Sequence, residues 1–183
     1  KGVGDNRDGR ISATLQKTVI DHFTDFSIKD DSGRQLAAVS AVCYGYGTLY
    51  MLSKSSGNER QLVLCDCDIN GGDPVFLDIG NYRPVSLFGG FPYSAAIGSE
   101  GEVIFINPYA LKHSSNLHIG AVSLPGGDKA SSVSFCDSLV FVLSQNGRVF
   151  LSNFDFSSSL LKFSAVSELS GTYDHCLAVS REC

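Results

Sequence analysis

The 183-residue sequence has no tryptophan, one methionine and few charges, since Asp, Glu, Lys and Arg make up only 18% of it. Hydrophobic residues make up 43%, and a chain of this composition is not intrinsically disordered. The net charge is −5, and the basic residues are scattered along the chain. Because binding to a phosphate backbone needs clustered Lys and Arg, we expect this segment to make no direct contact with nucleic acid.

Long apolar runs and glycosylation sequons are also missing. No run approaches the roughly 20 residues that cross a bilayer, and the opening KGVGDNRDGR is not typical of a signal peptide. No Asn lies in an Asn-x-Ser/Thr sequon. Several of the six cysteines lie in apolar patterns such as VCY and FCD, where a free thiol packs as a small hydrophobic group. We therefore expect a cytoplasmic or nuclear protein with no membrane partner.

Short apolar runs rich in Val, Leu, Phe, Tyr and Ile dominate the sequence. Clusters of Gly, Ser, Asn, Asp and Pro interrupt them every 8–12 residues, which is typical of all-β proteins. Residues 13–23 fit a helical turn or a strand equally well. The other runs predict strands at 36–44, 47–53, 61–66, 75–79, 84–88, 93–98, 102–106, 119–124, 131–136, 139–144, 148–152, 164–169 and 175–180.

Four segments resemble one another. Each has a Val-Ser pair, an apolar strand, a polar turn and a second strand. The pairs are Val39-Ser40, Val85-Ser86, Val133-Ser134 and Val166-Ser167. In the second strands, Ile97 and Leu143 are 46 residues apart, Leu52 and Ile97 are 45 apart, and Leu143 and Val179 are 36 apart. The chain therefore carries a degenerate repeat of about 46 residues that is shortened in its last copy.

A repeat of this length fits one four-stranded blade of a β-propeller, at roughly 5–6 residues per strand plus turns. One small sheet cannot bury both of its faces, so the blades must stack on one another. The Glu100-Gly101 and Asn146-Gly147 pairs are typical of hairpin turns, because Gly adopts positive φ at low cost. We expect one partial propeller domain over residues 1–183, with repeat units at roughly 24–66, 67–112, 113–153 and 154–183.

The repeat resembles that of the regulator-of-chromosome-condensation family, whose consensus has Val-x-x-Gly, a His, a Leu-Ala-Leu strand and a Gly turn before Val-Tyr/Phe. The segment 166–180 is the best copy, with Gly171, His175 and the strand Cys176-Leu177-Ala178-Val179 in family order. The segment 85–105 is a second copy, with Tyr93 in place of the His.

Other parts of the chain carry the resemblance less completely. The segment 133–153 is a third copy without the first Gly, and residues 2–12 resemble the link that follows a repeat's last strand. The family's Trp-Gly after that strand is replaced by Ile106-Asn107 and Ser152-Asn153. Five residues are interpreted as structural members of the repeat, namely Gly90, Gly101, Gly147, Gly171 and His175.

The resemblance implies a seven-bladed β-propeller, of which this chain holds about three to four blades. The chain is then expected to belong to a longer propeller, or to be completed by a second segment. The implied function is that of a protein–protein interaction scaffold. Its specific form is regulation of a small GTPase, as guanine-nucleotide exchange on Ran. No residue of this sequence matches the family's exchange site position by position.

One segment invites a metal interpretation. Asp66, Asp68 and Asn70 match the first half of a calcium loop, D-x-D-x-N-G, which supplies side-chain oxygens to Ca²⁺. The loop lacks the bidentate Glu at its twelfth position, which is Leu77. A solvated hairpin turn explains the same residues. If the segment instead binds calcium, the alternative interpretation is an extracellular or surface calcium-loop propeller that acts in adhesion or glycan processing.

Other candidate residues are sparse. Phe154, Asp155 and Phe156 lie in a Ser-rich connection, where exposed aromatic residues could anchor a protein partner. The four His residues form no pair with metal-ligand spacing, and no nucleophile motif, phosphate-binding loop or paired-carboxylate motif occurs. We therefore expect no cofactor, and the sequence favours binding over catalysis.

Overall fold

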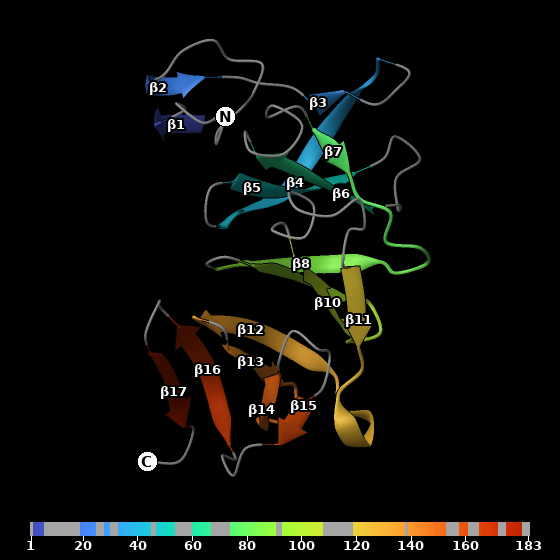
Figure 1. Ribbon diagram of the computed structural model, residues 1–183, viewed down its shortest axis with the longest axis vertical. Helices are drawn as coiled ribbons and strands as arrows, with labels where there is room; N and C mark the ends of the chain where they lie inside the picture. The colour runs from blue at the N-terminus through green and yellow to red at the C-terminus, as the bar shows by residue number, and fades with distance from the viewer. Residues whose placement is uncertain are drawn as a thin grey trace. The chain divides into compact units, whose positions relative to one another are not determined.

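The computed structural model describes residues 2–5, 19–24, 28–29, 33–44, 47–53, 60–66, 74–90, 93–107, 119–137, 139–152, 158–160, 165–171 and 175–180 (Figure 1). The chain forms two compact units, Lys1–Arg83 and Pro84–Cys183, and each is described by itself. None of the described residues forms a helix long and apolar enough to span a bilayer.

The first unit contains two antiparallel sheets. β1 (Gly2–Asp5) pairs with β2 (Val19–Thr24). The other sheet has five strands in chain order: β3 (Ile28–Lys29), β4 (Gln35–Tyr44), β5 (Gly47–Ser53), β6 (Arg60–Asp66) and β7 (Val75–Phe76). Of the two interpretations of residues 13–23, the strand holds from residue 19 onward, and residues 13–18 lie outside the described part.

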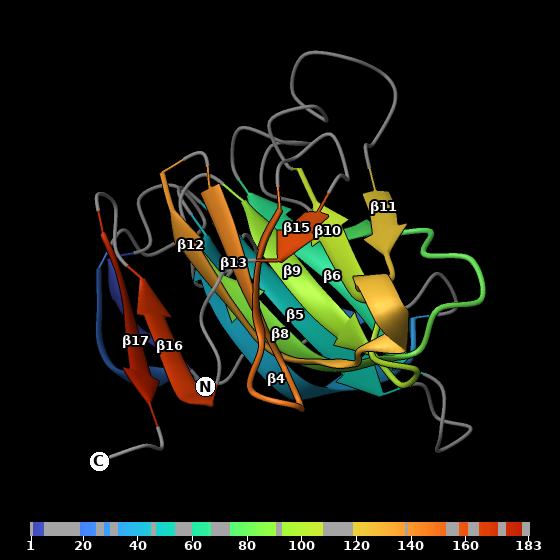
Figure 2. The same ribbon diagram turned by 90° about the horizontal axis from the view of Figure 1, so that it is seen from below.

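The second unit contains three sheets. The first is ordered β8 (Pro84–Gly89), β9 (Ser94–Gly98), β10 (Val103–Ile106) and β11 (Ile119–Val122). A 3-10 turn, η2 (Pro125–Gly127), leads to the second sheet of β12 (Ala130–Cys136), β13 (Leu139–Ser144), β14 (Val149–Ser152) and β15 (Ser158–Leu160). The third is the pair β16 (Val166–Gly171) and β17 (Cys176–Ser180). Figure 2 shows this pair beside β12.

The all-β prediction is confirmed, because every predicted strand corresponds to an observed one. The strands β1, β3 and β15 have no predicted counterpart; β3 and β15 are two and three residues long, too short for a recognisable alternation. The sheets are also displaced along the chain from the predicted repeat units. The second unit's first sheet spans residues 84–122, for example, and the predicted unit spans 67–112. The division into repeat units stays a prediction.

The strand register reveals the repeat more sharply than the sequence does. The first long strand of four sheets has an irregularity, a β-bulge, against its neighbour. The bulges lie between Ala38 and Ser40 in β4, Pro84 and Ser86 in β8, Ala130 and Ser132 in β12, and Val166 and Glu168 in β16. Successive bulges are 46, 46 and 36 residues apart. The period of 46 and its shortening to 36 are therefore properties of the backbone.

The register corrects one position in the sequence alignment of the second strands. Ile97 and Leu143 do hold equivalent positions, since they pair with Ser86 and Ser132 just after the bulges. In the first unit, however, the equivalent residue is Met51, which pairs with Ser40. The 45-residue interval in the sequence alignment instead makes Leu52 the equivalent of Ile97. Side chains on a strand alternate between faces, so this one-residue slip would place an inward position outward.

Apolar packing joins the sheets of the second unit. One cluster buries β9 and β10 side chains against β12, β13 and β14, with Phe105 and Phe150 only 2% and 1% exposed. A second cluster joins Leu143 and Val149 to Val166, with Leu169 packed at its edge. β12 thus lies in the core and contacts both β8 and β16 (Figure 1).

Candidate functional site

A repeated backbone contact holds neighbouring sheets of the second unit together. The amide of Ala130 donates a 2.9 Å hydrogen bond to the carbonyl of Gly101, and the amide of Val166 donates a 3.0 Å bond to Gly147. Both glycines have positive φ, +84° and +75°. A Cβ on Gly101 would lie 2.8 Å from the Cα of Lys129. Glycine is therefore required here for both the hairpin turn and the close approach of the next sheet.

Two further predicted repeat residues, Gly90 and Gly171, both lie close to Phe135. A Cβ on Gly90 would come within 2.5 Å of the Phe135 side chain, and a Cβ on Gly171 would collide with the Phe135 carbonyl oxygen. Gly90 follows β8 and Gly171 ends β16. The absence of side chains at these two positions lets β8 and β16 approach β12 closely.

The bulges of β12 and β16 carry an equivalent serine. The Ser131 hydroxyl donates a 3.0 Å hydrogen bond to the carbonyl of Leu143, and Ser167 donates a 3.1 Å bond to the carbonyl of Val179. The two serines are 36 residues apart, like the bulges. A bulge locally disrupts the strand ladder, and the serine hydroxyl supplies a donor at that point. Val39 and Val85 occupy this position in β4 and β8.

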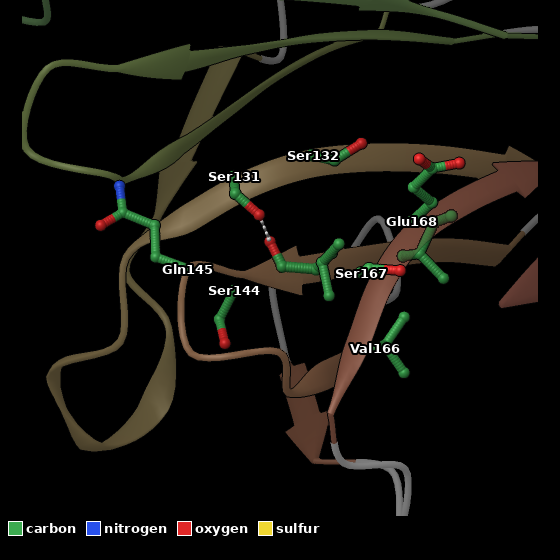
Figure 3. A pocket seen from close by; sticks show the side chains of 9 residues that line it. Ser131, Ser132, Ser144, Gln145, Val166, Ser167 and Glu168 are labelled. Atoms are coloured by element: carbon green, nitrogen blue, oxygen red, sulfur yellow. Dashed lines mark hydrogen bonds between the residues drawn. The ribbon is translucent and has the colours of Figure 1, made fainter. Parts of the chain in front are cut away.

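Next to these bulges lies a cavity of about 610 Å³, which we name the bulge-end cavity (Figure 3). It separates the β12–β13 hairpin from β16. Its polar lining residues are Ser131, Ser132, Ser144, Gln145, Ser167 and Glu168, and its apolar ones are Leu143, Val166 and Leu169. Glu168 is its only charged residue and is exposed. The cavity therefore offers hydroxyl and carboxamide groups, with one carboxylate, beside an apolar surface.

A second cavity, of about 340 Å³, continues along the same strands. It shares Ser132 and Leu169 with the bulge-end cavity and reaches Phe135 and Gly171 at the far end of β12 and β16. Together the two cavities form what we name the β12–β16 groove. A volume of several hundred cubic ångströms is the usual size of a binding pocket.

A charged cluster supports one wall of the groove. The guanidinium of Arg148 bonds the carboxylate of Asp128, and the Asn146 amide donates a 2.9 Å hydrogen bond to the same oxygen, Oδ1. The Arg148 bond holds the pKa of Asp128 below its ordinary value, and the Asn146 bond acts in the same direction, while desolvation opposes both. The amide of Arg148 also donates a 3.1 Å bond to the Ser144 hydroxyl. The cluster thereby fixes the hairpin that carries Ser144 and Gln145.

The other predicted site residues are not brought into this groove by the described structure. Asp66 is the last residue of β6, and Asp68 and Asn70 lie outside the described residues, as do Phe154, Asp155 and Phe156. His175 precedes β17 and is exposed. Among the described residues no group of three or more His, Cys, Asp or Glu side chains could hold a metal ion. The calcium-loop and aromatic-anchor interpretations stay predictions.

Sequence reasoning missed the residues that line the groove. Ser131, Ser132 and Glu168 belong to no motif, and they meet only because β12 packs against β16. A usable signal was nevertheless present, since Ser131 and Ser167 are separated by the 36-residue interval already found between Leu143 and Val179. Alignment at that interval would have paired the two bulge serines.

No protein-family model matches the sequence, and no curated protein matches it. Several solved structures match the fold. Human WBSCR16 aligns with 98% of this chain at a TM-score of 0.65 and 12% identity. The fold is that of an RCC1-like propeller. Saccharomyces cerevisiae Prp20p, described with its binding to Gsp1p and histones, aligns with 79% of this chain at a TM-score of 0.53 and 11% identity.

A third similar structure is the complex of Kap60 with yeast RCC1 (Prp20), which aligns with 91% of this chain at a TM-score of 0.60 and 9% identity. The aligned parts cover 54%, 45% and 46% of the three longer chains. This chain therefore spans about half the length of the propellers that it resembles. At these identities the likeness concerns the fold alone.

Proposed function

We propose that this chain is a protein-interaction module that binds its partner through the β12–β16 groove. The groove itself is the observation that carries this proposal, because it combines an apolar surface with hydroxyl groups and one exposed carboxylate. No described cluster supports a metal-dependent reaction. Interfaces between proteins combine apolar contacts with a small number of polar groups in this way.

The groove's chemistry specifies the kind of side chain that it accepts. Glu168 attracts a Lys or Arg from the partner, and an Arg guanidinium would also donate hydrogen bonds to nearby oxygens. Leu169, which is only partly buried, would contact the aliphatic part of that side chain. An extended loop that inserts one basic residue is therefore the best-fitting ligand.

The proposed partner is a small GTPase of the Ran type. Support comes from the fold shared with yeast Prp20p, whose structure was described with its binding to Gsp1p. The finer form of the proposal is guanine-nucleotide exchange on that GTPase. One fold can serve many functions, so binding to the GTPase and nucleotide exchange are tested separately.

The test uses biolayer interferometry with the immobilised 183-residue chain and purified Ran, either loaded with GDP or stripped of nucleotide. We expect saturable binding. Glu168→Lys should weaken it by about tenfold or more, since like charges then face each other across the contact. The matched control is Glu100→Lys, because Glu100 is exposed and lies outside the groove, and its 3.7 Å ion pair with Lys129 lies at the surface, where such pairs contribute little.

Three results would contradict the proposal at different levels. Absence of saturable binding at about 100 μM Ran, where even weak specific complexes form, would reject the GTPase as partner. Equal effects of the two Glu→Lys substitutions would reject the groove as the binding surface. Binding without faster release of fluorescent GDP would reject exchange while leaving the interaction module intact.

A further inference from the structure

The outward face of β17 carries two of the four exposed large apolar side chains among the described residues of the second unit. Leu177 and Val179 point to the same side of this strand, two residues apart, and are 62% and 54% exposed. Adjacent exposed apolar side chains mark an interaction site more often than apolar residues scattered singly over a surface do. β17 also has β16 as its one neighbour among the described strands, whereas β9 and β13 are each paired on both sides.

The strand register identifies what covers this face elsewhere in the same unit. The residues equivalent to Leu177 and Val179 are Ala95 and Ile97 in β9, and Phe141 and Leu143 in β13. Ala95 and Ile97 are buried in the cluster that includes β12. Phe141 and Leu143 belong to the cluster that includes β16. In both cases the first strand of a further sheet covers the face.

The covering positions are also equivalent to each other. β12 contributes Ala130 and Val133 to the first cluster, and β16 contributes Val166 and Leu169 to the second, each 36 residues further on. The corresponding residues of β4, given by the 92-residue distance between the bulges of β4 and β12, are Ala38 and Ala41. Both are exposed. The apolar face of β17 is therefore uncovered, and β4, which is equivalent to the covering strands β12 and β16, has its corresponding face exposed.

We propose that β17 of one chain docks against β4 of a second copy of this chain, so that two copies close head to tail. The contact would repeat the packing of β12 on β9 and of β16 on β13, and so continues an interface that the second unit already contains twice. Two identical contacts related by a twofold axis close such an assembly. This chain covers about half of each similar propeller, so two copies together have the length of one such ring.

The first test is the mass of the 183-residue chain in solution, measured by light scattering during size exclusion across a dilution series. We expect twice the mass of one chain. Val179→Asp should weaken dimerisation by about tenfold or more, because an unpaired carboxylate is costly to bury. The control Val85→Asp makes the same substitution at a residue of matched exposure, 56%, and should leave the dimer intact. Circular dichroism melting checks that each variant remains folded.

The second test asks which surfaces meet. Ala41→Asp alone should weaken dimerisation as Val179→Asp does, because it places a carboxylate on the opposite face of the contact. A mixture of the Val179→Asp and Ala41→Asp variants retains one intact face of each kind and should recover dimers. A wild-type monomer at all concentrations, which closure within one chain would give, overturns the proposal. So does a dimer that survives Ala41→Asp, as pairing of β17 with itself would give, or one that Val85→Asp dissociates equally.

Discussion

The carbonyl of Gly147 accepts a 3.0 Å hydrogen bond from the amide of Val166, and this bond ties the turn of one sheet to the first strand of the next. The same bond recurs between Gly101 and Ala130 at 2.9 Å. Because donor and acceptor recur at intervals of 36 and 46 residues, the unit of repetition includes the junction between sheets as well as the sheet. Substituting the turn glycine at such a junction should therefore destabilise the fold more when the next sheet lies closer to it.

Alanine substitutions at three glycines with similar positive φ distinguish the cost of backbone strain from the cost of steric contact. Gly126, at +72°, has nothing within 4 Å of an added Cβ, Gly147 has its nearest neighbour at 3.1 Å, and Gly101 has a neighbouring Cα at 2.8 Å. Substitution by Ala should cost about 1 kcal/mol at Gly126, from strain alone. It should cost more at Gly147 and about 3 kcal/mol at Gly101. Urea unfolding measures the order, and equal losses at all three positions would show that the junctions contribute nothing.

The bulge serine of β12 should be replaceable by the residue found in other sheets. Ser131→Ala removes the hydroxyl that bonds the Leu143 carbonyl, which should cost about 1 kcal/mol. Ser131→Val introduces the residue that β4 and β8 carry at this position, and its strand preference should recover part of the loss. Thermal unfolding compares the two variants. A Val variant less stable than the Ala variant would refute the equivalence of the four bulges.

Acid should weaken the Asp128 cluster. Arg148 holds the pKa of Asp128 in the folded protein below its ordinary value of 3.8, so the unfolded chain takes up a proton first as the pH falls. The stabilisation is complete well above pH 3.8 and is lost as the pH falls through the lowered folded value. Asp128→Asn should therefore lower the urea midpoint near neutral pH and do so progressively less below pH 3.8. If the difference in urea midpoint between the wild type and Asp128→Asn stayed constant from neutral pH to below pH 3.8, the ionised carboxylate would be excluded as its cause.

The shared core of the first two sheets of the second unit should be sensitive to truncation. Phe150 is 1% exposed and belongs to the cluster that joins these sheets, so Phe150→Ala should cost about 3–5 kcal/mol. Leu139, which begins β13 and is 37% exposed, provides the control, and Leu139→Ala should cost less than about 1 kcal/mol. Chemical denaturation gives both values. Similar losses would mean that the cluster is not the core.

The strands and hairpin turns could be predicted because their signals are local. The alternating run of β13 and the Asn146-Gly147 turn each lie within a few neighbouring residues. Register was harder, because the Val133-Ser134 pair resembles Val39-Ser40 in sequence although Ser40 is equivalent to Ser132 in the ladder. A shift of two residues keeps every side chain on its face, so alternation alone cannot detect it.

The groove could not be predicted from local pattern. Ser131 and Glu168 are 37 residues apart in the sequence, and nothing in either neighbourhood indicates the other. They come together because Gly171 allows β16 to approach β12 at Phe135 and because the Gly147–Val166 bond fixes the other end of the junction. The Asp128 cluster likewise depends on a hairpin 18 and 20 residues further along the chain.

Hydrogen–deuterium exchange of the chain with and without Ran tests the central claim most directly, because it maps where a partner binds without any substitution. The account predicts slower exchange in residues 131–135 and 166–171, which line the β12–β16 groove, and little change in β5 and β6 of the first unit. Protection confined to the first unit, or no protection at a saturating concentration of Ran, would contradict it.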